Sequence, residues 1–167
     1  MSTRSAAELY EDDFYAWTQL QAKELRRFAR TRPNLPLDLP HVAEEIADLG
    51  KNLRDSMRSW ARHLIEHLLL LQYSPAQEPR RGWIAEIVNL RGEIEDRLTP
   101  RLRRDLKRHL PRLYDRARRD LRKKLAPYGE AHIADRIPET CPYTFDQILD
   151  EDWWPVWAEE SAGGEQP

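Results

Sequence analysis

The sequence has a single cysteine, six glycines and no long apolar run. One cysteine, Cys141, excludes an intramolecular disulfide and fits a reducing compartment. The longest purely apolar run, 68–71, is far shorter than the ~20 residues that a membrane-spanning helix needs. Residues 1–15 lack the apolar core of a signal peptide. These absences predict a cytoplasmic protein that has no membrane partner, and no sequence motif calls for a cofactor.

The charge is nearly balanced overall but strongly segregated along the chain. The net charge of −2 gives no global attraction to nucleic acid or to anionic membranes. Residues 101–124 nevertheless contain twelve Lys or Arg and three Asp, a net charge of +9, and residues 130–167 carry −9 from ten acids and one Arg. We therefore interpret the two segments first as intramolecular partners. The alternative is nucleic-acid binding by the basic helix, with Arg112, Arg116, Arg119 and Lys123 as candidate contacts.

Apolar residues recur at helical spacing over several long segments, and no segment shows sustained two-residue alternation. The pattern predicts an all-α, up-and-down bundle of four main helices plus a short C-terminal helix that packs back on it. The predicted helices lie near 8–30, 40–73, 82–98, 100–126 and 144–150. We expect one domain over 1–160, a disordered tail at 161–167, and a kink or a split near His109 caused by Pro111.

The longest predicted helix organises the chain. Its apolar stripe is expected to face inward and comprises Val42, Ile46, Leu49, Leu53, Trp60, Leu64 and Leu71. Near the end of the chain, Trp153, Trp154 and Trp157 follow the short C-terminal helix. Because three tryptophans would expose a large apolar area, we expect this segment to pack back on the bundle.

Three segments together resemble a known bacterial family. They read YEDDFYAWTQLQAKELR, EEIADLGKNLRDSMRSWARHLIEHLLLLQYSP and, preceded by LYDRARRDL, CPYTFDQILDEDWWP. In content and order they are similar to the family called domain of unknown function twenty-nine, from about residue 9 to 155. The resemblance implies an all-helical bundle and supplies no reaction. The stretch after Pro100 is more basic than the resemblance leads us to expect.

Two histidines on the longest helix could share a metal ion. His63 and His67 are one turn apart and, with Glu66, spell an H-x-x-E-H pattern. A third ligand would have to come from another helix, for example from His109 or Cys141. We favour a structural interpretation, in which His67 is buried and hydrogen-bonded to a neighbouring helix while His63 lies at the edge. No metal is therefore predicted, and His63 and His67 remain the alternative candidates for one.

An acidic cluster near the start of the same helix is the other candidate. Glu44, Glu45, Asp48 and Lys51 could form a carboxylate site, but Glu45 and Asp48 are too far along the helix to share an ion with His67. A solvated face with inter-helix salt bridges is the simpler interpretation. Glu45 and Asp48, like His67, are thus predicted to be structural polar residues, and no catalytic residue is predicted.

Three functions follow from these features. The first is a non-catalytic helical module that binds another protein or itself, so that the chain could be a dimer. The second is nucleic-acid binding through 101–124. The third is a metal-dependent enzyme built around His63 and His67.

Overall fold

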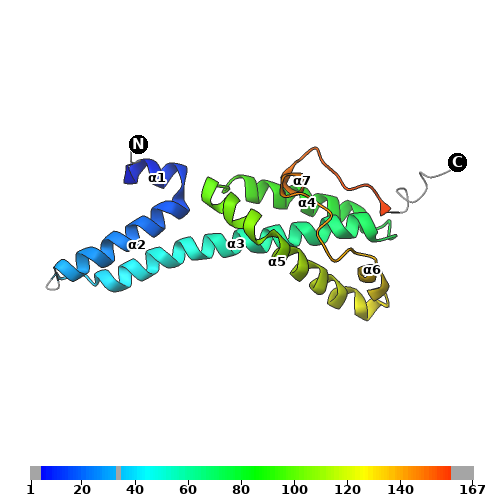
Figure 1. Ribbon diagram of the computed structural model, residues 1–167, viewed down its shortest axis with the longest axis horizontal. Coiled ribbons are helices and arrows are strands. Elements are labelled where there is room, and N and C mark those ends of the chain that lie inside the picture. Colours follow the sequence, from blue (N-terminus) through cyan, green and yellow to red (C-terminus); the bar gives the residue numbers. More distant parts are fainter. Residues whose placement is uncertain (1–4, 33–34, 159–167) are drawn as a thin grey trace. The chain divides into compact units, whose positions relative to one another are not determined.

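The computed structural model describes residues 5–32 and 35–158, and these residues form helices and no strand (Figure 1). This confirms the all-α prediction. None of the described helices has an apolar stretch long enough to cross a bilayer. The elements are α1 (Ala6–Asp12), α2 (Phe14–Thr31), α3 (Leu39–Tyr73), α4 (Arg80–Glu95), α5 (Pro100–Leu125), the 3₁₀ helix η1 (Ala126–Tyr128), α6 (Ala131–Asp135) and α7 (Phe145–Leu149).

Local capping explains where the helices begin. Thr99 accepts a hydrogen bond from the backbone N–H of Leu102, and Pro100 occupies the first position of α5. Thr144 and Gln147 form a capping box at the start of α7. The predicted bounds of α3, α4, α5 and α7 therefore agree with the structure to within three residues.

The prediction of one helix over 8–30 is wrong, because Asp13 divides it. Asp13 has φ −151°, closes α1 through its N–H to the carbonyl of Leu9, and caps α2 by accepting from the N–H of Ala16 at 2.9 Å. A short acidic side chain that can bond the backbone favours such a boundary over a helix interior. The short α6 was also not predicted.

The predicted split near Pro111 does not occur, since α5 continues through it, and the kink given as the alternative stays a prediction. Proline removes one backbone N–H and crowds the carbonyl four residues earlier, that of Lys107. Both Pro111 and Lys107 are exposed, so water can satisfy that carbonyl.

The chain divides into two compact units. Unit 1 comprises residues up to 57 together with 98–105, and unit 2 comprises 58–97 together with the residues from 106 onward. The prediction of a single domain over 1–160 stays a prediction, and the predicted tail at 161–167 lies outside the described residues.

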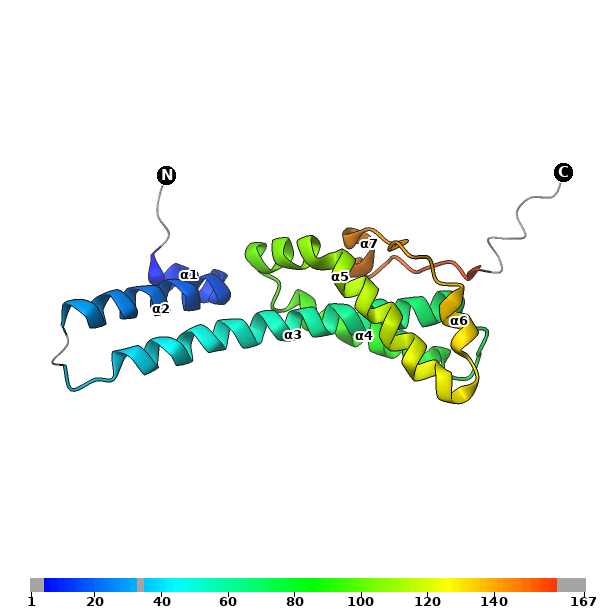
Figure 2. The same cartoon turned by 60° about the horizontal axis from the view of Figure 1, so that its bottom comes forward.

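Unit 1 is built around an antiparallel hairpin of α2 and the first half of α3, which run side by side in Figures 1 and 2. The helices approach through small residues. Ala16 and Ala22 of α2 are buried, as are Ala43 and Gly50 of α3. Tyr10, Phe14 and Trp17 add an aromatic cluster with ring centroids 4.9–5.6 Å apart where α1 meets α2. The core of this unit therefore contains few large side chains.

The expectation that Val42 and Leu49 face inward is wrong. Val42 is 43% exposed and Leu49 is 52% exposed. Their sequence neighbours Ala43 and Gly50 are buried instead, because close packing of α2 on α3 selects small side chains. The apolar stripe of α3 thus lies beside the contact face in this unit.

Unit 2 has a conventional large-residue core. Leu64 and Leu71 of α3 are buried as predicted, whereas Trp60 is half-buried. They are joined by Ile65, Leu68 and Leu69 of α3, Ile87 and Ile94 of α4, Leu106, Tyr114, Ala117 and Leu121 of α5, and Phe145 and Ile148 of α7. Tyr114 also donates its hydroxyl to the carbonyl of Pro138 at 2.6 Å, which ties the connection after α6 to α5.

A buried arginine fixes the tryptophan segment. Arg91 of α4 is 3% exposed and donates to four backbone carbonyls, those of Gln147, Ile148, Glu151 and Trp153, at 2.9–3.5 Å. Its guanidinium also lies 5.1 Å from the ring centroid of Trp154, and the ring of Trp153 contacts that of Tyr143. The predicted return of this segment onto the helices is confirmed for Trp153 and Trp154.

Candidate functional site

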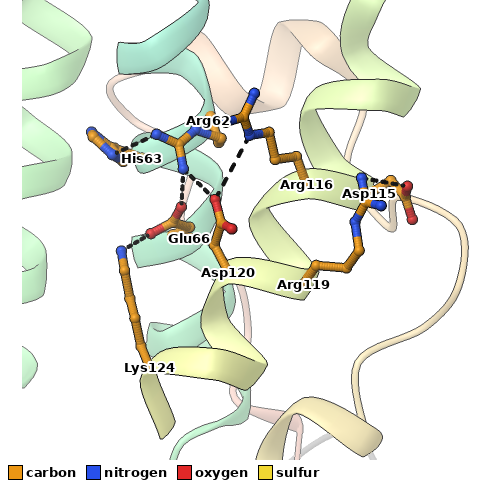
Figure 3. Close-up of polar contacts among 8 residues, drawn as sticks. All are labelled: Arg62, His63, Glu66, Asp115, Arg116, Arg119, Asp120 and Lys124. Carbon is orange, nitrogen blue, oxygen red and sulfur yellow. Dashed lines mark hydrogen bonds and ion pairs between the residues drawn. The ribbon is translucent and has the colours of Figure 1, made fainter.

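A buried carboxylate joins α3 to α5 in unit 2 (Figure 3). The Glu66 side chain is 3% exposed, and its two oxygens accept from Arg62 Nη1 at 3.2 Å and from Lys124 Nζ. Arg62 also pairs with Asp120 of α5. Each acid therefore faces a cation, as a buried carboxylate requires.

His63 lies at the edge of this cluster. Arg62 Nη2 donates to His63 Nε2 at 3.0 Å, and because a guanidinium can only donate, Nε2 acts as the acceptor (Figure 3). Burial lowers the pKa of His63, and the positive charges of Arg62 and Lys124 lower it further, while Glu66 opposes them. His63 is thus held in its neutral form.

His67 lies one turn further along α3 and is half-buried. Its Nδ1 atom is fully buried and has no hydrogen-bond partner in the described part of the chain, so this nitrogen does not make the predicted bond to a neighbouring helix. Burial lowers the pKa of His67, with Glu86 and Glu66 acting in the opposite direction.

The structure does not assemble the ligands that a metal would need. Over residues 5–32 and 35–158, no three His, Cys, Asp or Glu side chains are grouped so that they could hold an ion. The proposed third ligands lie elsewhere: His109 is near Arg58, and Cys141 directs its thiol toward the carbonyl of Tyr143 at 3.4 Å. Burial raises the pKa of the Cys141 thiol, which disfavours the thiolate that metals and electrophiles require.

The outer face of α5 carries the predicted basic residues. Arg112, Arg116, Arg119 and Lys123 are all exposed. Asp115 and Asp120, the acids nearest to them, belong to the same helix: Asp115 lies 3.3 Å from Arg119, and Asp120 lies 4.0 Å from Arg116. We call these four residues the basic stripe.

The predicted pairing of the acidic segment with the basic helix includes a contact from Arg122 to Asp135 at 2.5 Å. The acids at 159, 160 and 165 lie outside the described residues. For these acids the intramolecular pairing stays a prediction.

The acidic cluster on α3 belongs to unit 1 and faces outward. Glu44, Glu45 and Asp48 are exposed, and Asp48 lies 3.9 Å from Lys51 on the same helix. This arrangement corresponds to the solvated face of the structural interpretation, and the described chain shows no inter-helix salt bridge from Glu45 or Asp48.

An apolar row adjoins these acids on α3. Val42, Ile46, Leu49 and Leu53 are spaced four, three and four residues apart, with Val42 and Leu49 exposed and the other two half-buried. This spacing is that of a coiled-coil contact seam. We call these four residues the hairpin seam.

Two important residues were missed by sequence reasoning, Arg91 and Arg62. Both are arginines among apolar helical neighbours, at positions where the period turns the side chain inward or to the rim of the core. An inward-facing arginine implies a buried acceptor, so the helical period was the available signal.

Comparison with known proteins agrees with this architecture. A crystal structure of an alpha-helical protein of unknown function from Rhodospirillum rubrum ATCC 11170 is similar, with a TM-score of 0.77 and 28% sequence identity over 91% of this chain and 93% of that one. No curated protein matches. The model of the family described as domain of unknown function DUF29 matches residues 9–154, nearly the whole chain. The chain therefore belongs to the DUF29 family.

Proposed function

We propose that this protein is an interaction module that associates with a second copy of itself through the hairpin of α2 and the first half of α3. The observation that supports this most directly is the exposure of Val42 and Leu49 beside the buried Ala43 and Gly50. A hairpin whose own contact uses alanine and glycine leaves its larger side chains available for another helix. Partner helices on the hairpin seam would bury them.

The composition of the hairpin core gives a reason for assembly. Two helices that meet through small residues remove little apolar area from water, and stability scales with that area at roughly 25 cal/mol per Å². Phe28, at 44% exposed, adds further apolar surface on α2. A second hairpin packed on the seam would give a four-helix arrangement with a larger core.

The charges of the hairpin are self-complementary. The C-terminal half of α2 is basic, with Lys23, Arg26, Arg27 and Arg30, whereas the start of α3 is acidic, with Glu44, Glu45 and Asp48. No ion pair joins the two sets within the described chain. In a two-fold symmetric pair each copy contributes both surfaces, so the basic helix of one copy can face the acidic helix of the other. This complementarity favours a second copy over an unrelated partner.

Sedimentation equilibrium of the full chain tests the proposal. We expect the wild type to be a dimer and Leu49→Glu to dissociate it by at least about tenfold in Kd, because the substitution places a charge in the apolar seam. Val88→Glu is the matched control, since Val88 is an equally exposed apolar residue of α4, at 56%. A monomeric wild type, or equal weakening by both substitutions, would refute self-association through this seam.

A further inference from the structure

We infer that the basic stripe of α5 is a binding surface for the phosphate backbone of double-stranded nucleic acid, used without regard to base sequence. This activity is separate from the proposed self-association, because the stripe belongs to unit 2 and the hairpin seam to unit 1. It rests on the placement, exposure and pairing of four side chains.

The stripe is a single straight row. Arg112, Arg116, Arg119 and Lys123 follow one another at steps of four, three and four residues, which keeps them on one face of the helix. The opposite face of α5 is anchored in the core by Tyr114, Ala117 and Leu121. The row is therefore exposed to solvent on a helix whose opposite face is packed in the core.

Neighbouring acids do not neutralise the row. Asp120, which could pair with Arg116, is engaged by Arg62, and its distance to Arg116 is 4.0 Å (Figure 3). Glu66 is likewise occupied by Lys124 and Arg62 on the inner side of α5. Asp115 pairs with Arg119, while Arg112 and Lys123 have no ion-pair partner in the described chain. The stripe thus keeps a net positive charge.

The geometry suits an extended polyanion better than a small anion. A small anion needs several donors that converge on one point, whereas these side chains are spread over about 17 Å, at 1.5 Å per residue. Each strand of a duplex presents one phosphate per roughly 3.4 Å of axis, so a row of this length spans about five phosphates. The guanidinium groups of three of the four residues can each donate two hydrogen bonds to a phosphate.

The stripe also indicates the mode of recognition. Reading bases requires side chains that reach base edges in a groove, typically Asn, Gln or Arg supported by a groove-filling element. The stripe contains no Asn or Gln, and its row of cations matches the backbone contacts that position proteins on a duplex. Binding should therefore be independent of sequence and strongly dependent on salt.

Fluorescence anisotropy of the full chain with two unrelated 20-base-pair duplexes, over a range of salt concentrations, tests the inference. We expect the two duplexes to bind equally, with a slope of log K against log salt of about −3.6, since four side chains each make one phosphate contact and each contact contributes about −0.9. The variant Arg112→Ala/Lys123→Ala removes the two cations of the stripe that have no ion-pair partner among the described residues. It should reduce the slope by about two and weaken binding at least tenfold at low salt.

The control variant Lys51→Ala/Arg81→Ala makes the same charge change at exposed positions of α3 and α4, outside the four residues of the stripe. It should bind like the wild type. Absence of duplex binding at 25 mM salt, or equal loss in the two variants, would overturn the inference. Tighter binding to polyglutamate or to phosphatidylserine vesicles than to the duplex would overturn it as well, because the row would then serve an acidic protein or a lipid surface.

Discussion

Gly50 of α3 lies so close to Thr18 of α2 that a Cβ atom on Gly50 would stand 2.1 Å from the Thr18 hydroxyl oxygen. Thr18 is fully buried and donates its hydroxyl to the carbonyl of Tyr15 at 2.8 Å, so it cannot turn away without losing that bond. The distance between the two helices of the hairpin is therefore set by the absence of one side chain.

Gly50→Ala should destabilise unit 1. Alanine gains about 1 kcal/mol of helix propensity over glycine, but overpacking costs about 1–3 kcal/mol, and a 2.1 Å approach is at the severe end. We expect a net loss of about 1–2 kcal/mol in urea unfolding. Gly92→Ala, where the new Cβ meets nothing within 4 Å, should instead stabilise by about 1 kcal/mol. Thr18→Ala should partly rescue Gly50→Ala, and a lack of coupling between them would contradict the close contact.

Arg91→Met should release the tryptophan segment. The substitution keeps the apolar stem but removes the donor to four carbonyls, of which the bond to Ile148 is buried and the other three are part-buried, at a cost of about 3 kcal/mol. The expected result is faster proteolysis within 145–158 and a red shift of tryptophan emission. Arg91→Lys should restore only part of the stability, since one ammonium cannot reach all four carbonyls. The control is Arg81→Met, at an exposed position of the same helix. If Arg91→Met is no more sensitive to protease than this control, the hydrogen bonds from Arg91 do not hold the tryptophan segment in place.

Glu66→Ala should cost about 1–3 kcal/mol. The loss is moderate because Arg62 keeps Asp120 as a partner and Lys124 is 59% exposed, so neither cation is stranded. The matched change is Asp115→Ala, which removes an acid from an exposed pair and should shift stability by less than about 0.5 kcal/mol. If thermal melts show the same loss of stability for Glu66→Ala and Asp115→Ala, the burial of Glu66 does not strengthen its ion pairs.

Stability should fall as the pH drops below about 6.5, the unperturbed pKa of histidine. His63 and His67 have lowered pKa values in the folded state, so in this range the unfolded chain binds more protons than the folded one, and protons favour unfolding. The loss should continue until the pH passes the folded pKa values. Urea unfolding at pH 7 and pH 5 measures it, and His67→Leu should flatten the difference. Exposed His41, whose pKa is raised by Asp38, acts in the opposite direction and serves as the control.

A chelator should leave the melting temperature unchanged. The Nε2 atom of His63 already accepts from Arg62, and a guanidinium 3.0 Å away repels a cation at that nitrogen. A melting temperature that falls with chelator in the wild type, and does not fall in His67→Ala, would instead identify a metal bound at this pair.

Local signals predicted the helices well, and long-range packing explains the exceptions. Thr99-Pro100 and Thr144 placed helix starts because capping depends on neighbours within three residues. The prediction that Val42 and Leu49 face inward was wrong because a periodic pattern is recognised from large apolar side chains. The close contact with α2 instead buries the small residues beside them, Ala43 and Gly50. The break at Asp13 was hidden in an acidic run that also suits a helix N-terminus.

The candidate sites show the same division. The basic stripe could be predicted from spacing alone, since one helix face is a local property. The hydrogen bonds of Arg91 could not be predicted, because the carbonyls that accept them lie 56–62 residues further along the chain. The roles of Arg62 and Asp120 likewise depend on a contact across 58 residues.

The separation of Arg91 from its acceptors also orders events during synthesis. The ribosome makes α4 well before residues 147–153, and until those carbonyls emerge the guanidinium can be satisfied only by water. Burial of the Arg91 side chain is therefore completed only after residues 147–153 have been made. A prematurely terminated chain that lacks this segment would have no carbonyl acceptors for the Arg91 guanidinium. Its α4 would pack less stably, and the chain would be degraded faster by cellular proteases.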